Sequence, residues 1–151
     1  MKLQVRSPIA GTVLDLADVP DPVFAQAMVG PGVAVLPPED ARDVVAPVDG
    51  TVITLHPHAF VVAAANGVGV LVHLGIDTVR LKGDGFTLHV VKGETVRAGQ
   101  PMVGWDPAAV QAAGYSTVCP VIALDAGADA LAEPASGRSV GAGDVLFTWH
   151  D

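Results

Sequence analysis

The histidines are the side chains whose type and position point to chemistry in this chain. The chain holds five of them: His56, His58, His73, His89 and His150. His73 closes the alternating apolar run at 67–74 (GVGVLVHL) and precedes a Gly-Ile-Asp turn, so we expect it at the end of a strand. A neutral imidazole nitrogen can attack phosphorus near pH 7 and form a phosphoramidate, without a metal ion or an added base. His73 is therefore the candidate phosphoryl acceptor, and a structural histidine bonded to a backbone carbonyl is the alternative.

His58 provides a second imidazole that a simple strand pairing would bring to the first. It lies fifteen residues upstream of His73, at the start of the apolar run 59–62 (AFVV). If that run pairs in antiparallel fashion with the strand of His73, the two rings face each other. One ring then takes the phosphoryl group, and the other donates a hydrogen bond to its oxygens. The spacing permits this pairing but does not require it.

Short strands separated by turns are the elements that must hold these rings. Half of the 151 residues are hydrophobic, and 17 Gly and 12 Pro supply turn residues. The segment 7–16 (SPIAGTVLDL) recurs at 46–55 (APVDGTVITL), and the segment 93–105 recurs at 137–149. These repeats predict an all-β fold, a pseudo-symmetric antiparallel β-sandwich or barrel built from a duplicated motif.

Helix is expected only as one or two short turns at the rim of the strands. Asp21-Pro22 before Gly30 reads as an N-cap, a first-turn proline and a C-terminal stop, and Asp106-Pro107 before Gly114 repeats this pattern. No linker or low-complexity run divides the chain, so we expect a single domain over residues 1–151.

Composition excludes several classes of function. No Gly-x-x-x-x-Gly-Lys-Ser/Thr and no Gly-x-Gly-x-x-Gly segment occurs, so we expect no nucleotide site and no cofactor. The lone Cys119 can form neither an internal disulfide nor a Cys-x-x-Cys site and reads as a core residue. No apolar run spans a membrane and no secretory signal precedes the first strand, which predicts a cytoplasmic protein. The net charge of −8 disfavours nucleic acid; it suits a partner with a basic face or serves solubility.

Ordered blocks of sequence resemble a known family. The segment 72–79 (VHLGIDTV), followed by 81–86 (LKGDGF), is similar to the signature of the glucose-type IIA phosphocarrier of the bacterial phosphoenolpyruvate-dependent sugar phosphotransferase system. Further blocks follow in the family's order at 7–11, 18–24, 46–50, 58–60 and 116–121, so the resemblance runs from about Ser7 to the C-terminus. It implies a cytoplasmic β-sandwich carrier in which His73 receives phosphate from phospho-HPr and passes it to a IIB domain of a sugar permease.

The resemblance also implies roles for the residues around His73. His58 matches the second family histidine, which stays unmodified and hydrogen-bonds the phosphoryl group. Asp21 and Asp77 match aspartates that flank the site and position an arginine of the partner. The apolar surface on which HPr and IIB dock corresponds to six residues, for which ordinary core positions are the alternative: Val23, Phe24, Met28, Val29, Phe60 and Val79.

Two departures from the family pattern matter. His56-Pro57 occupies the place of a Thr-Asn pair whose hydroxyl supports the two histidines, so His56 either replaces that contact or leaves it missing. Only six residues precede Ser7, fewer than the amphipathic N-terminal tail with which some members contact membranes. We therefore expect no direct membrane insertion.

Two alternatives belong to other classes of function. His73-x-x-x-Asp77 and His56-Pro-His58 match ligand patterns of zinc peptidases on related duplicated β folds, although in reversed order. No resident metal is expected, but His58 and His73 can hold an adventitious zinc ion if a partner adds ligands. The second alternative is a non-catalytic regulatory binding domain on the same fold, which replacement of His73 would distinguish from a carrier.

Overall fold

The computed structural model describes residues 2–127 and 129–150, and short antiparallel strands dominate its secondary structure. The largest sheet has the strand order β13-β2-β3-β11-β7-β6-β5-β9. Its strands, in chain order, are β2 (Gly11–Asp15), β3 (Gly32–Leu36), β5 (Gly50–His56), β6 (Ala59–Ala63), β7 (Gly69–His73), β9 (Thr95–Val96), β11 (Cys119–Ala123) and β13 (Ser139–Val140). The predicted all-β antiparallel fold is thus confirmed.

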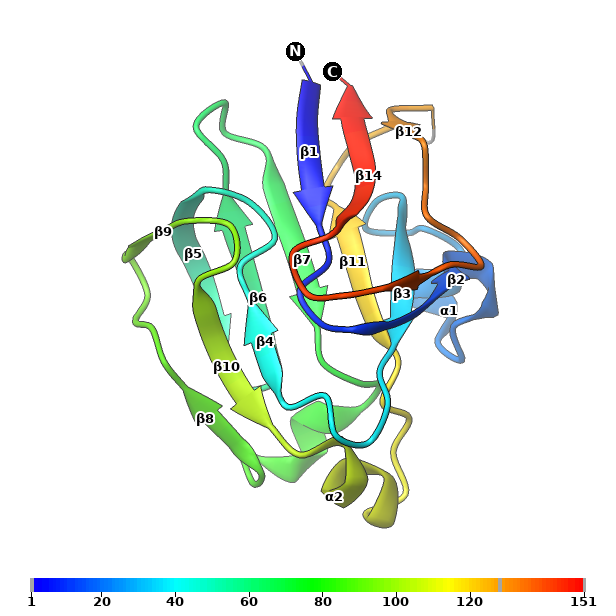
Figure 1. Ribbon diagram of the computed structural model, residues 1–151, viewed down its shortest axis with the longest axis vertical. Helices are drawn as coiled ribbons and strands as arrows, with labels where there is room; N and C mark the ends of the chain where they lie inside the picture. Colours follow the sequence, from blue (N-terminus) through cyan, green and yellow to red (C-terminus); the bar gives the residue numbers. More distant parts are fainter. Residues whose placement is uncertain (1, 128, 151) are drawn as a thin grey trace.

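Two three-stranded sheets complete the structure. One has the order β1-β14-β12, with β1 (Lys2–Arg6), β12 (Leu131–Ala132) and β14 (Val145–His150). The other has the order β4-β10-β8, with β4 (Asp43–Val45), β8 (Phe86–Leu88) and β10 (Pro101–Trp105). In the first, Lys2 pairs with His150, so the two ends of the described chain lie side by side, as Figure 1 shows.

Hydrogen bonds between the repeated segments confirm the predicted pseudo-symmetry. The amide of Arg6 donates to the Pro47 carbonyl at 2.9 Å, and the amide of Val45 donates to the Pro8 carbonyl at 2.8 Å. The two donors each lie one residue before a copy of the first repeat, and the two acceptors are the prolines at the second position of each copy. In the same way Gly137 donates to Val13 at 2.8 Å, and Gly93 donates to Val52 at 2.7 Å. The repeated segments therefore make equivalent backbone contacts in pairs, as a duplicated motif requires.

Both short helices form where the sequence predicted them. Helix α1 (Pro22–Ala25) is capped by Asp21, whose carboxylate accepts the Val23 amide at 2.9 Å. Helix α2 (Pro107–Ala112) is capped by Asp106, which accepts the Ala109 amide at 3.4 Å. Two 3₁₀ turns, η1 (Leu16–Asp18) and η2 (Thr78–Leu81), add to these. Within residues 2–127 and 129–150, no helix is long and apolar enough to cross a bilayer.

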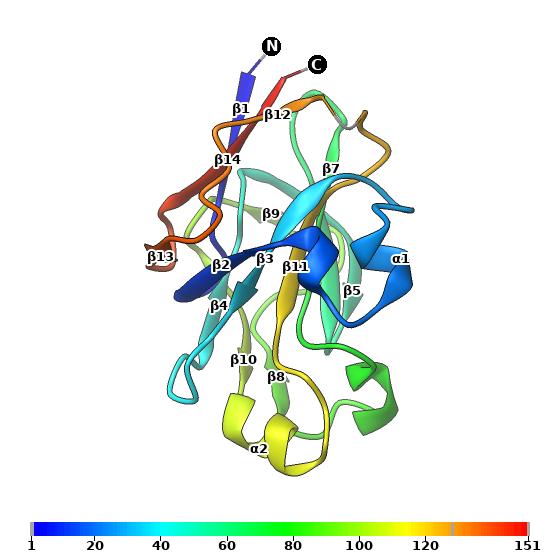
Figure 2. The same ribbon diagram turned by 90° about the vertical axis from the view of Figure 1, so that its right-hand side faces the viewer.

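The strands enclose one main core, and α1 covers a smaller one. The main core contains the largest fully buried side chains, among them Phe60, Phe147, Ile9, Leu74 and Met102. Cys119 belongs to it, as predicted, and burial raises the pKa of its thiol to about 12. The smaller cluster contains Phe24 of α1 and Ile76 of the loop after β7. Figure 2 shows α1 packed outside the strands and α2 at the end of the molecule opposite β1 and β14.

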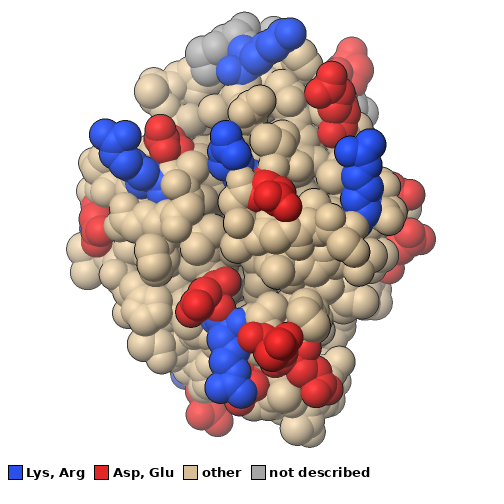
Figure 3. Space-filling model, in the orientation of Figure 1, with Lys and Arg blue, Asp and Glu red and all other residues tan. Residues whose placement is uncertain are grey.

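One face of the molecule carries charged side chains of both signs. On the face drawn in Figure 3 the basic side chains stand apart from one another, with acidic side chains between them and wide uncharged areas around them. The net charge of the chain is −8. A net negative charge of this size repels a polyanion such as nucleic acid.

Candidate functional site

The two histidines predicted to meet are neighbours in the structure. Strands β6 and β7 pair in antiparallel fashion with Ala59 opposite His73, and the Leu74 amide donates to the His58 carbonyl at 2.7 Å. The ring centroids of His58 and His73 lie 5.3 Å apart, with the ring planes at 71°. The hairpin that was only permitted by the spacing is thereby confirmed.

A backbone carbonyl determines which nitrogen of His73 can act. Nδ1 of His73 lies 2.5 Å from the Gly75 carbonyl oxygen. Because a carbonyl oxygen can only accept, Nδ1 carries the proton in this contact and Nε2 keeps the lone pair. Sequence reasoning did not identify the Gly75 carbonyl, since a backbone partner cannot be read from residue types.

The loop after His73 is held by buried contacts. The Thr78 hydroxyl donates to the Leu74 carbonyl at 2.6 Å, and the Ile76 amide donates to the Ser116 carbonyl at 3.0 Å. Gly75 has φ +79°, and a Cβ there would lie 2.6 Å from Cγ2 of Thr78 and 2.7 Å from the oxygen of Ser116. Only glycine suits this position, so the carbonyl that faces His73 is fixed by its loop.

Both imidazoles are held in their neutral form. Burial, then the charges of His73 and His56, lower the pKa of His58 from 6.5 to about 4. Burial also lowers the pKa of His73, although the Gly75 carbonyl, Asp21 and Asp77 oppose this effect. Near pH 7 the Nε2 lone pair of His73 is consequently free to react.

The predicted flanking residues approach His73 from two loops. Asp21 caps α1 and Asp77 precedes η2, and the charge of each favours the protonated form of His73. The Phe24 ring lies 5.2 Å from the His73 ring, centroid to centroid, at 57°. Phe24 is itself buried, so it forms the wall behind His73 rather than an open surface.

Four of the six predicted apolar contact residues are at least partly accessible. The exposed fractions are 41% for Val23, 67% for Met28 and 58% for Val79, while Val29 is half-buried. Val23 lies in α1, Met28 and Val29 follow that helix, and Val79 lies in η2.

The prediction for Phe60 is wrong, because its side chain is fully buried in the main core. Phe60 pairs with Val72, which is also fully buried, whereas Ala59 pairs with His73. Neighbouring residues of a strand point to opposite faces of the sheet. Phe60 therefore points to the face of the sheet opposite to that of His73, although it is close to His58 in sequence.

His56 lies beside His58 in the hairpin between β5 and β6. The two ring centroids are 5.6 Å apart and the planes differ by 25°, a stacked arrangement. His56 is exposed and pairs with Ala59 across the turn at Pro57 and His58. The rings of Phe24, His73, His58 and His56 thus form a continuous row, each in contact with the next.

Other candidate chemistry gains no support from the described residues. Within residues 2–127 and 129–150, no group of three or more His, Cys, Asp and Glu side chains is arranged to hold a metal ion, so the zinc-peptidase alternative has no site there. The segment 137–141 spells Gly-Arg-Ser-Val-Gly, a pattern of activated serines. Ser139, however, lies in the edge strand β13, paired with Thr12, and not on a strand-to-helix turn.

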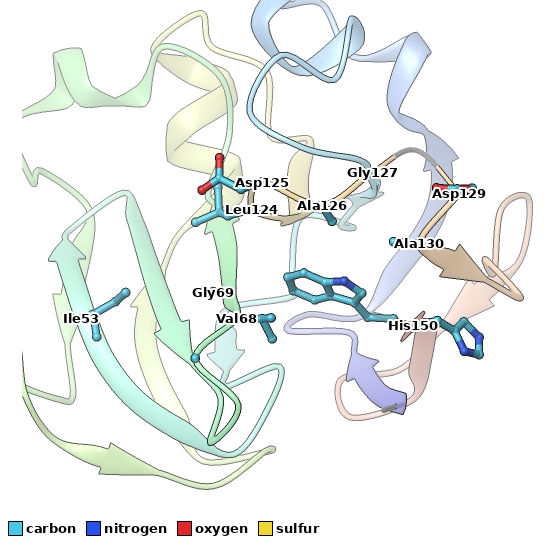
Figure 4. Close-up of a pocket in the computed structure, with 12 residues that line it drawn as sticks. Ile53, Val68, Gly69, Leu124, Asp125, Ala126, Gly127, Asp129, Ala130 and His150 are labelled. Atoms are coloured by element: carbon cyan, nitrogen blue, oxygen red, sulfur yellow. The ribbon is translucent and has the colours of Figure 1, made fainter.

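A cavity of about 790 Å³, shown in Figure 4, has neither His58 nor His73 among its lining residues. Gly69, Leu124 and His150 are among its lining residues. Gly69 begins β7 and His73 ends it, so the cavity and the imidazole pair are at opposite ends of that strand. A side chain that exchanges a chemical group with another protein must lie at an accessible surface rather than in a cavity. We therefore take the His58–His73 pair, and not this cavity, as the candidate functional site.

Comparison with known proteins agrees with this assignment. Residues 3–128 match the family "phosphoenolpyruvate-dependent sugar phosphotransferase system, EIIA 1". The chain is 42% identical over 123 residues to the PTS system glucose-specific EIIA component of Oceanobacillus iheyensis, covering 80% of this chain and 73% of that protein. It is 38% identical over 126 residues to the PTS system glucose-specific EIIBCA component of Corynebacterium glutamicum, covering 82% of this chain and 18% of that protein.

A solved structure shows the same fold. The structure of the glucose permease IIA from Mycoplasma capricolum superimposes with a TM-score of 0.91 at 36% sequence identity, covering 98% of this chain and 96% of that one. Together with the family match and the paired histidines, this likeness shows that the chain belongs to the EIIA 1 family of the phosphoenolpyruvate-dependent sugar phosphotransferase system and is a phosphotransferase component.

Proposed function

We propose that this protein is a cytoplasmic phosphocarrier that accepts a phosphoryl group from phospho-HPr on Nε2 of His73 and passes it to a IIB domain for sugar uptake. The observation that carries the proposal is the contact between Nδ1 of His73 and the Gly75 carbonyl, which leaves Nε2 with a lone pair. In the transfer a bond forms between Nε2 and phosphorus while the bond from phosphorus to the donor breaks. The onward step reverses these roles.

The neighbouring groups suit the charges that develop during transfer. Once Nε2 is bound to phosphorus the ring becomes electron-poor, and its Nδ1 proton is donated more strongly to Gly75. The negative charges of Asp21 and Asp77 favour the same electron-poor ring. His58, 5.3 Å away between ring centroids, has one N–H in its neutral form and can donate it to a phosphoryl oxygen.

The surroundings of His73 also suit a labile phosphorus–nitrogen bond. Phe24 covers one side of the ring, and burial is the largest influence on the ring's pKa. Limited access of water slows hydrolysis of the phosphohistidine between the two transfers.

The exposed apolar residues beside the histidines are the docking surface that the carrier presents. Val23, Met28 and Val79 supply it, with Asp21 and Asp77 placed to receive an arginine of the partner. The match to a short segment of a longer EIIBCA component supports a IIB domain as acceptor. The same surface serves donor and acceptor in turn, because both must reach the same nitrogen.

The test is incubation with phosphoenolpyruvate, enzyme I and HPr, followed by intact-mass analysis. We expect the chain to gain one phosphoryl group and His73→Ala to gain none. His58→Gln is expected to accept phosphate but to deliver it poorly to a IIB domain, because it lacks the ring that supports the phosphoryl oxygens. His89→Gln, which removes an exposed histidine of another region, is the matched control and should behave as the unaltered chain. Phosphorylation of His73→Ala at an unchanged rate would overturn the proposal.

A further inference from the structure

The ring of His58 lacks the anchor that holds His73. His73 donates to the Gly75 carbonyl, whereas none of the hydrogen bonds among the described residues involves the ring of His58. Rotation of a histidine ring about its last side-chain torsion has a broad energy profile, so rotamer preference alone does not orient it. The rings that it touches can supply that orientation.

Two rings touch His58, and they do so differently. His73 meets it at 71°, an edge contact, while His56 meets it at 25°, a stacked contact. Stacking restrains rotation of both rings, because turning either one out of plane gives up the favourable offset-stacked contact. His56 therefore restrains the ring that faces His73.

The hairpin turn explains why His56 is in place to do this. His56 and Ala59 pair across the turn, which leaves Pro57 and His58 as its two central residues. Neither central residue has a positive φ, so the turn is not of the primed types, and proline suits the first central position of a type I turn. This stiff turn fixes the backbone between His56 and His58, and their rings stack at a centroid separation of 5.6 Å.

We infer that His56 is a positioning residue for phosphoryl transfer, acting by stacking on His58 so that His58 keeps its orientation toward the phosphoryl group on His73. The inference rests on the proposed function for its consequence, but its structural part concerns the unphosphorylated protein. The contribution comes from the flat ring. An aromatic residue without ring nitrogens should serve in its place.

The experiment compares His56→Ala and His56→Phe with the control His89→Ala. Nitrogen-detected NMR titration of the unphosphorylated proteins reports the pKa of His58. Phosphoryl-transfer assays with phospho-HPr and a IIB domain report the rates of phosphate acceptance and of onward transfer. We expect His56→Ala to raise the pKa of His58 from about 4 toward 6.5, since both the covering ring and the nearby charge are lost. Onward transfer by this variant should slow about tenfold or more, as expected for a misoriented group.

Recovery by phenylalanine decides the inference. His56→Phe should raise the pKa of His58 less than alanine does and should restore onward transfer, and His89→Ala should change neither. If alanine and phenylalanine both transfer normally, or if both fail equally, stacking is not the function of His56. The NMR titration remains informative even if no phosphorylation occurs, so failure of this inference and failure of the proposed function are distinguishable. His56→Ser, with a thermal melt, separates a local effect from loss of folding.

Discussion

At His73 one backbone contact determines that Nδ1 carries the proton and that Nε2 keeps the lone pair. The Gly75 carbonyl takes the Nδ1 proton, and the loop that carries Gly75 is fixed by Thr78 and Ser116. Burial keeps both His73 and His58 neutral near pH 7. The site therefore meets the two demands on a nucleophilic imidazole, a free lone pair and a fixed direction.

Neutral buried histidines also make folding stability depend on pH. The folded pKa of His58 is about 4 and its ordinary value is 6.5, so between these values the unfolded chain binds more protons. Stability is then complete above about pH 6.5 and falls as pH decreases toward 4. We expect the melting temperature to drop through this window and His58→Gln to weaken the dependence. Identical pH profiles for the two proteins would contradict this assignment.

Helix α1 contributes both to the stability of the fold and to the surroundings of His73. Its N-cap, Asp21, accepts the Val23 amide, and its Phe24 lies against His73. The corresponding cap of α2, Asp106, accepts the Ala109 amide at 3.4 Å, three residues on rather than two, in a helix that bears no residue of the site. The pair provides a matched comparison.

Asp21→Ala and Asp106→Ala should each lower the free energy of unfolding by about 1 kcal/mol, the usual contribution of an N-cap. Only Asp21→Ala should also slow phosphoryl transfer, because Asp21 acts on His73 through its charge. Denaturant unfolding and transfer assays measure the two effects. Equal loss of transfer in both variants would show that the effect is one of stability alone.

The elements were largely predictable because their signals are local. The two aspartate-proline caps, the strand end at His73 and the repeated turns all depend on neighbouring residues. Phe60 was misplaced because its face is set by register with β7, a non-local pairing. The contact of His73 with the Gly75 carbonyl and the stacking of His56 on His58 could not be predicted from the sequence either, because both depend on the three-dimensional shape of a loop and a turn.

At the scale of the whole molecule, the two copies of the first repeat are joined by backbone hydrogen bonds. The reciprocal bonds Arg6 to Pro47 and Val45 to Pro8 cross between the halves, and β1 covers β14 with a fully buried Val5. A chain without residues 2–6 would leave Phe147 uncovered and the facing backbone groups of β14 without partners. We expect such a truncation to lose cooperative thermal unfolding, as measured by circular dichroism. A sharp transition near that of the full chain would refute this.

The pairing of Lys2 with His150 has a consequence for how this carrier can be joined to other domains. His150 lines the same cavity as Gly69, and Gly69 lies about 13 Å from His73 along β7 by strand rise. Tethers attached beyond Lys2 and beyond His150 would therefore start from the same edge of the molecule. The domain should therefore fold equally well at the N-terminal or the C-terminal end of a fused polypeptide. A circular permutant that joins the two termini should keep the same fold.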